Sequence, residues 1–169
     1  MRLLPVAALA LALLPAAGAR AATTSITGTD AKRLWATINV CDTADFADTV
    51  GIRASMPGLG NSRERLYMRF RVQYLRPSDG RWRDIGPGGD SGFVLVGSGR
   101  WRRREAGQNF TLNPPAAGRA FRVRGLVTFE WRRGQLVVRR EQQRTHGGHR
   151  GTTGADPEGY SAASCVVTG

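Results

Sequence analysis

The feature that most constrains this chain is an alternation of apolar and polar side chains with a period of two residues. It is clearest in the stretch RLYMRFRVQYL, residues 65–75. Successive side chains of a β-strand point to opposite faces of its sheet, so a strand with one buried face alternates in this way. The stretch predicts one face made of Leu66, Met68, Phe70, Val72 and Tyr74, and an opposite face made of Tyr67, Arg69, Arg71 and Gln73.

The same period recurs from residue 34 onward, and no stretch beyond the first 21 residues has a convincing helical period. Strands are predicted at 34–40, 49–55, 65–75, 81–85, 92–96 and 109–112, in a hairpin over 120–143 that turns at Arg133-Gly134, and around Cys165. With a two-residue turn, Trp131 faces Leu136 and Phe129 faces Val138 in that hairpin. The sequence therefore predicts an all-β fold.

The start of the chain has the features of a secretory leader. Met1-Arg2 precedes the apolar run LLPVAALALALLPAAG, and the small-x-small site Ala19-Arg20-Ala21 follows it. The run is shorter than a membrane span and contains two prolines, so residues 1–21 are predicted to be a signal peptide. Residues 22–169 then form one mature domain. We expect it to be secreted as a monomer with no membrane span.

Seven or more short strands in a domain of this size predict two antiparallel sheets packed as a sandwich. The only cysteines, Cys41 and Cys165, lie near the two ends of the mature chain. Because an exported protein meets an oxidising environment, we expect them to form a disulfide that joins the first strand to the last. Closing so long a loop contributes about 4–5 kcal/mol in the chain-entropy model.

The segments around the two cysteines carry a family resemblance. The opening LWATINVCDT and the ending DPEGYSAASCVV together resemble a group of uncharacterised, secreted, immunoglobulin-like sandwich proteins of high-GC, actinobacterial-type bacteria. The resemblance implies an immunoglobulin-like sandwich and brings no catalytic motif with it. In true immunoglobulin domains the bridge joins two inner strands over a buried tryptophan. The chain departs from that pattern, which leaves the strand order open.

Arginine dominates the charge of the chain. Lys and Arg together number 25 against 13 acidic residues, and Lys32 is the only lysine. Guanidinium groups form paired hydrogen bonds with phosphate and carboxylate, and exposed aromatic rings stack on bases or sugars. The arginines that flank tryptophan are therefore candidate anion-binding residues. The candidates are Arg81, Trp82, Arg83, Arg100, Trp101, Arg102, Arg103 and Arg104, and Trp131-Arg132-Arg133 and Arg139-Arg140 follow the same pattern.

Two interpretations of these arginines stay open. They either hold an anionic polymer, such as teichoic acid, an acidic glycan or nucleic acid, or form a solvated basic face above tryptophans that point inward. The sequence thus predicts a non-catalytic extracellular binding or structural module of unknown specificity. Binding of an anionic polymer is the alternative that names a ligand.

The run Gly89-Asp90-Ser91-Gly92 is similar to the nucleophile segment of trypsin-like serine proteases. Such a serine needs a histidine base, which precedes it in that family. Here His146 and His149 both follow Ser91. We therefore expect no catalytic residue, and a secreted hydrolase is the weaker alternative function.

Two segments contain residues that can bind metal ions. His146-Gly-Gly-His149 supplies only two of the ligands that a tight site needs. Asp42, Asp45 and Asp48 recur every third residue, which does not match the Asp-x-Asp-x-Asp-Gly calcium loop. We interpret both segments as solvated loops, with calcium at the aspartates as the alternative, and predict neither a metal ligand nor a cofactor.

Overall fold

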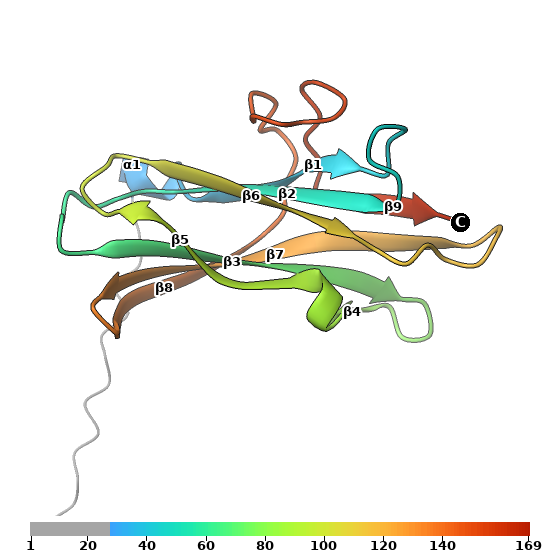
Figure 1. The fold of residues 1–169 in the computed structure, drawn as a ribbon, viewed down its shortest axis with the longest axis horizontal. Helices are drawn as coiled ribbons and strands as arrows, with labels where there is room; N and C mark the ends of the chain where they lie inside the picture. The colour runs from blue at the N-terminus through green and yellow to red at the C-terminus, as the bar shows by residue number, and fades with distance from the viewer. Residues whose placement is uncertain (1–27) are drawn as a thin grey trace, which may run out of the picture.

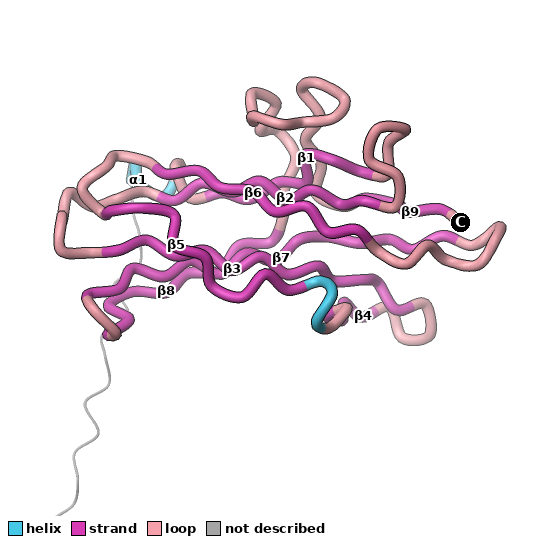
Figure 2. The backbone as a smooth tube through the Cα atoms, in the orientation of Figure 1, coloured by secondary structure: helices cyan, strands magenta, loops and turns pink. Residues whose placement is uncertain are grey.

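The computed structural model describes residues 28–169, so the predicted signal peptide at 1–21 lies outside the described part. Figures 1 and 2 show the arrangement of the elements. They are α1 (Gly28–Ala31), β1 (Trp35–Cys41), β2 (Thr49–Met56), β3 (Arg65–Arg76), β4 (Arg81–Asp84), η1 (Pro87–Gly89), β5 (Asp90–Ser98), β6 (Arg104–Thr111), β7 (Ala120–Arg133), β8 (Leu136–Arg144) and β9 (Cys165–Thr168). Within this part of the chain, no helix has the length and apolar character needed to cross a membrane.

The strands form two antiparallel sheets that face each other (Figure 1). The smaller sheet has the order β1-β2-β6, and the larger has the order β4-β3-β7-β8, with β5 also paired to β3 and β9 to β7. These orders correspond to the A-B-E and C′-C-F-G arrangements of immunoglobulin sandwiches. The predicted all-β, immunoglobulin-like, two-sheet sandwich is confirmed.

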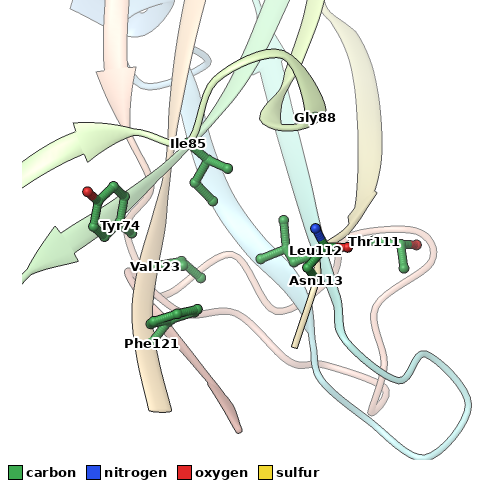
Figure 3. A pocket seen from close by; sticks show the side chains of 8 residues that line it. All are labelled: Tyr74, Ile85, Gly88, Thr111, Leu112, Asn113, Phe121 and Val123. Carbon is green, nitrogen blue, oxygen red and sulfur yellow. The ribbon is translucent and has the colours of Figure 1, made fainter. Parts of the chain in front are cut away.

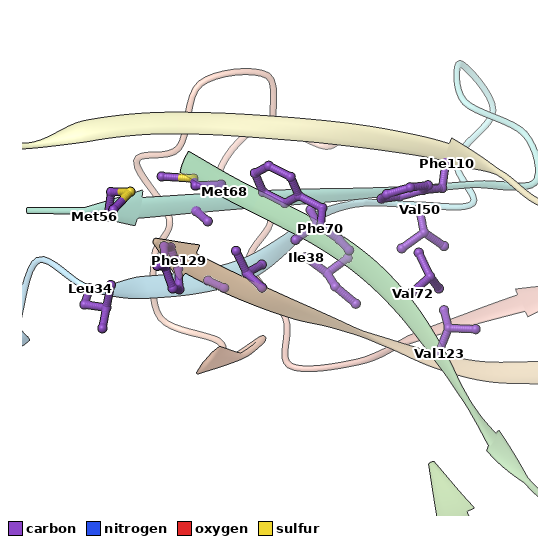
Figure 4. Packing of buried hydrophobic residues seen from close by; sticks show 14 of the residues in the cluster. Leu34, Ile38, Val50, Met56, Met68, Phe70, Val72, Phe110, Val123 and Phe129 are labelled. Carbon is purple, nitrogen blue, oxygen red and sulfur yellow. The ribbon is translucent and has the colours of Figure 1, made fainter. Parts of the chain in front are cut away.

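The core lies between the sheets and is built by the alternation seen in the sequence. Leu66, Met68, Phe70 and Val72 of β3 are fully or almost fully buried, as the pattern of residues 65–75 predicts. They pack with apolar residues of β1, β2, β6 and β7 (Figure 4). Trp131 is the largest buried side chain, and its indole N–H donates to the Pro57 carbonyl over 2.9 Å.

Two local predictions were wrong. The strand expected at 109–112 begins at Arg104, because the whole of β6 pairs with β2. In the β7–β8 hairpin, Trp131 pairs with Arg139 and Phe129 with Glu141, not with Leu136 and Val138. The turn is Gly134-Gln135, and β8 has one extra residue opposite the step from Trp131 to Arg132. The turn lies one residue later than predicted, which shifts the register by two residues, and the bulge shifts it by one more. Leu136, next to the turn, is 67% exposed.

The predicted disulfide between Cys41 and Cys165 is present and joins β1 in one sheet to β9 in the other. The long segment 145–164 between β8 and β9 packs against β1, on the side of the smaller sheet (Figure 1). It binds the strand through backbone hydrogen bonds such as His146 N–H to the Ala36 carbonyl, and Ile38 and Ala162 bond each other in both directions. Covering the edge of β1 in this way protects it from pairing with another chain.

Candidate functional site

The structure divides the predicted arginine and tryptophan set between the two ends of β3. Arg81, Trp82 and Arg83 lie on β4, which pairs with the Arg76 end of β3. Arg100, Trp101, Arg102 and Arg103 form the turn after β5, and Ser98 of β5 pairs with Arg65 at the other end. At a rise of about 3.3 Å per residue, the ends of β3 are roughly 36 Å apart. The two groups do not form one cluster.

The turn at the Arg65 end borders a shallow hollow. Ser62, Arg65, Ser98, Arg100 and Trp101 line this hollow, whose volume is about 500 Å³. The Trp101 side chain is 48% exposed, and the Arg100 guanidinium lies 4.5 Å from the centre of its ring. Neither Arg65 nor Arg100 forms an ion pair with a carboxylate in residues 28–169. We call this site the Trp101 hollow.

The remaining arginines of that turn have protein contacts that limit their availability. Arg103 pairs with Glu105 over 3.2 Å. Arg104 donates from Nε to the Val96 carbonyl over 2.9 Å, which ties the start of β6 to β5. Arg102 is exposed. The cationic character of the Trp101 hollow therefore rests on Arg65 and Arg100, of which the sequence analysis singled out only Arg100.

At the β4 end, Trp82 is a half-buried support for an arginine of another strand. The Arg124 guanidinium of β7 lies 4.2 Å from the centre of the Trp82 ring, and its Nε donates to Gln73 over 3.0 Å. Burial, and after it the charge of Arg144, lowers the pKa of Arg124. A guanidinium keeps its proton at any physiological pH. Two arginines therefore meet at this end, and neither has a carboxylate partner in the described residues.

Between the two ends runs the outer face of the larger sheet. Residues paired directly across neighbouring strands share a face, as Arg71, Leu126 and Arg144 do here. The residues of this face alternate with the buried residues of β3 and β7, and many of them are arginines. We define the arginine face as Arg65, Arg69, Arg71, Arg124, Arg132, Arg140 and Arg144, with Tyr67, Phe93 and Trp82 between them.

Three carboxylates hold part of the arginine face in place. Glu130 is 0% exposed and accepts hydrogen bonds of 2.6 Å from Nε of both Arg132 and Arg140. Arg71 pairs with Asp84 over 2.7 Å, and Arg69 with Asp90. The hydrogen bond from Arg69 is the main cause that lowers the pKa of Asp90. Seven arginines face three carboxylates, so four positive charges are left unbalanced.

Aromatic rings lie against the arginines of this face. The Arg132 guanidinium lies 4.2 Å from the centre of the Tyr67 ring and 4.6 Å from that of Phe93. Such contacts are favourable because the negative face of the ring attracts the cation. Together with the hydrogen bond to Glu130, they hold the Arg132 guanidinium in place.

Ser91 lies at the start of β5, with its hydroxyl between two backbone groups. The Phe70 N–H donates to Ser91 Oγ over 2.9 Å, and the hydroxyl donates to the Gly92 carbonyl over 2.8 Å. The two histidines lie on the segment against β1: His149 stacks on Trp35 with ring centres 4.4 Å apart. Burial, and after it the charge of His146, lowers the pKa of His149. The structure thus places Ser91 and the histidines on different elements and does not bring them together.

Asp42 of the aspartate loop binds the protein itself. It accepts hydrogen bonds from the backbone N–H of Asp48 over 2.8 Å and of Thr168 over 3.1 Å. The Thr168 bond is the main cause that lowers the pKa of Asp42. Among residues 28–169, no three histidine, cysteine, aspartate or glutamate residues are placed to share a metal ion. Asp42 instead connects the β1–β2 loop to β9.

Adjacent arginine and tryptophan residues in the sequence do not reveal most of the arginine face. A sheet face is made of every second residue of several strands, so its members are never adjacent in sequence. The signal was present in the outward set of residues 65–75, which contains Tyr67, Arg69 and Arg71. Its continuation on β7 and β8 required the strand order.

No protein-family model matches the chain, and no curated protein shows significant similarity to it. The class of protein is therefore defined by its own architecture: an immunoglobulin-like β-sandwich, bridged between its first and last strands, with an arginine-rich outer sheet face.

Proposed function

We propose that this protein is a secreted, non-catalytic binding module that holds an anionic polymer along the arginine face, from the Trp101 hollow to Arg124. The observation that carries the proposal is a row of cations without ion pairs in the described residues: Arg65, Arg124 and Arg144 on the arginine face, and Arg100 in the turn beside it. Trp101 and Trp82 lie beside the two ends of that row.

The length of the face favours a polymer over a single small anion. From Arg65 to Gln73, β3 extends about 27 Å at roughly 3.4 Å per residue. Arg100 and Arg124 already lie against tryptophan rings, so they lose little side-chain freedom on binding, which reduces the entropic cost of association. Phosphodiester and carboxylate polymers, including teichoic acids, nucleic acids and acidic glycans, share the chemistry that such a row recognises.

Export is proposed on two observations. The first 21 residues have the composition of a secretory leader. The Cys41–Cys165 disulfide is of a kind that persists in oxidising compartments. The absence of catalysis is proposed because the Ser91 hydroxyl bonds to backbone groups, without an activating base among its contacts.

The test compares two triple variants with the same change in net charge. Arg65, Arg100 and Arg144 lie on or beside the arginine face, are exposed and form no ion pair in residues 28–169, and all three change to Gln. The control changes Lys32, Arg119 and Arg150, which are also exposed, form no ion pair in the same residues and lie on other parts of the molecule. Binding of a fluorescein-labelled poly(dT) strand and of inorganic polyphosphate is measured by anisotropy and competition.

We expect the face variant to bind far more weakly than the control. Each phosphate contact contributes about −0.7 to the slope of log affinity against log salt for single strands, so losing three should flatten the slope by about 2 between about 50 and 200 mM salt. Equal weakening of both variants would show that net charge alone attracts the polymer. That result would overturn the proposed site.

A further inference from the structure

A second opening lies at the end of the sandwich opposite the Trp101 hollow, between the two sheets (Figure 3). Tyr74 of β3 and Phe121 and Val123 of β7 form the wall from the larger sheet. Thr111, at the end of β6, and the two residues after it form the wall from the smaller sheet, while Ile85 and Gly88 come from the connection between β4 and β5. We call it the Phe121 pocket. Its volume is about 610 Å³.

We propose that the Phe121 pocket binds an uncharged, aromatic small molecule with one hydrogen-bonding group. Among residues 28–169, no charged side chain lines this pocket, although the full chain carries a net charge of +12. Pockets of roughly 300–1,000 Å³ with mostly apolar walls and a few polar groups are typical of sites for small molecules. The volume therefore fits a compact ligand, whereas the arginine face fits a polymer.

The walls specify the chemistry of the ligand. Tyr74 and Phe121 supply two aromatic rings from neighbouring strands, and Ile85 and Leu112 face the gap from opposite sides (Figure 3). Aromatic pairs gain energy beyond the area that they bury, so flat rings suit this gap. The Asn113 amide offers a donor and an acceptor at the wall of the smaller sheet, which sets one polar position on the ligand.

Large apolar side chains are left exposed around this opening. Phe121 is 42% exposed and Ile85 is 38% exposed, while Val123 deeper in the pocket is fully buried. A ligand seated against them removes apolar surface from water, which is favourable in proportion to the area covered. The pocket thus continues the core outward, with Thr111 and Asn113 as the polar residues of its wall.

The test uses the neutral dye N-phenyl-1-naphthylamine, whose fluorescence rises and shifts to the blue in apolar surroundings. We expect saturable binding of one dye per chain, with an affinity that does not change between low and high salt, because no charge takes part. Phe121→Ala should lower the affinity for the dye by about tenfold, since the dye loses its contact with one aromatic side chain. Phe46→Ala is the matched control: Phe46 is 40% exposed and does not line the pocket.

A second variant covers the case in which Phe121→Ala changes the fold. Ile85→Arg places a charge in the pocket at an exposed position, so it should abolish dye binding without changing the circular dichroism spectrum or the melting temperature. Absence of saturable binding, or equal weakening by Phe46→Ala and Phe121→Ala, would overturn the proposal. The face variant at Arg65, Arg100 and Arg144 should bind the dye normally, so failure of the polymer proposal leaves this one intact.

Discussion

The two ends of strand β3 carry opposite chemistry. At the Arg65 end, the hollow beside Trp101 is lined by two arginines and two serines. At the Tyr74 end, the pocket beside Phe121 is lined by apolar and uncharged side chains. One strand with a single alternating pattern thus reaches a charged opening on its outer side and an apolar opening on its inner side.

This difference follows from which layer each opening belongs to. The Trp101 hollow continues the outer face of the larger sheet, where polar residues of β3 alternate with its core residues. The Phe121 pocket continues the space between the sheets, where the core residues point. A sandwich can therefore carry two independent sites of opposite polarity, because the two faces of one strand do not share an environment.

The largest difference between the two ends is expected when the disulfide is removed, because the loss should affect the Phe121 pocket and not the Trp101 hollow. Cys165 pairs with Val123, so the bridge to Cys41 fixes the sheets beside the Phe121 pocket. Changing both cysteines to Ser should lower the free energy of unfolding by about 4–5 kcal/mol, because the unfolded chain regains its loop entropy. Urea unfolding measures this loss. Dye binding should weaken in the folded fraction while polymer binding is retained, and the reverse order would contradict the assignment of the bridge to the apolar end.

A substitution of Glu130 should have an effect of intermediate size. It should lower the stability of the fold and raise its affinity for the polymer. The buried carboxylate of Glu130 forms ion pairs with both Arg132 and Arg140, which are partly exposed. Glu130→Gln should lower the free energy of unfolding by about 2 kcal/mol, below the usual cost of breaking a fully buried pair because water screens the two arginines. The same change removes a negative charge from the arginine face, so polymer binding at low salt should become tighter.

Glu141→Gln is the control for Glu130→Gln. Glu141 lies on β8, next to the strand that carries Glu130, pairs with Phe129 in register, and forms no ion pair in residues 28–169. It changes the net charge equally. Equal gains in polymer affinity from both variants would show that overall charge, and not the arginine face, controls binding.

Much of the fold was predictable because it depends on alternation and turns, which are local in sequence. The pattern of residues 65–75 identified the buried side of β3, and the two cysteines identified their bridge. The hairpin register was not predictable, since neither the placement of the turn at Gly134-Gln135 nor the bulge of one residue in β8 leaves a clear sequence signal. The arginine face was likewise hidden, because its members on β3, β7 and β8 become neighbours only through long-range pairing.

In the candidate site, too, the local sequence does not predict the surroundings of individual residues. Trp82 and Trp101 have the same arginine neighbours in sequence, yet Trp82 supports Arg124 on the sheet and Trp101 is exposed in a turn. An arginine-tryptophan dipeptide carries no information about which strand will cover the ring. Only the arrangement of β4 against β3 and β7 separates the two cases.

The smallest effect on stability is expected at Trp101, and it is also the sharpest test of the charged end. Because Trp101 is half exposed and lies in a turn, Trp101→Ala should change the free energy of unfolding by less than about 0.5 kcal/mol. Trp82→Ala should lower the free energy of unfolding by about 1 kcal/mol, since Arg124 loses its stacking partner.

In polymer binding, the order of the two effects should reverse, with the larger effect at Trp101. Trp101→Ala should weaken the binding of poly(dT) at both low and high salt, because salt does not screen stacking on bases as it screens charge. The binding of inorganic polyphosphate, which has no rings, should be affected much less. If Trp101→Ala weakens the binding of poly(dT) and of polyphosphate equally, the ring serves only to position Arg100, and the hollow recognises charge alone.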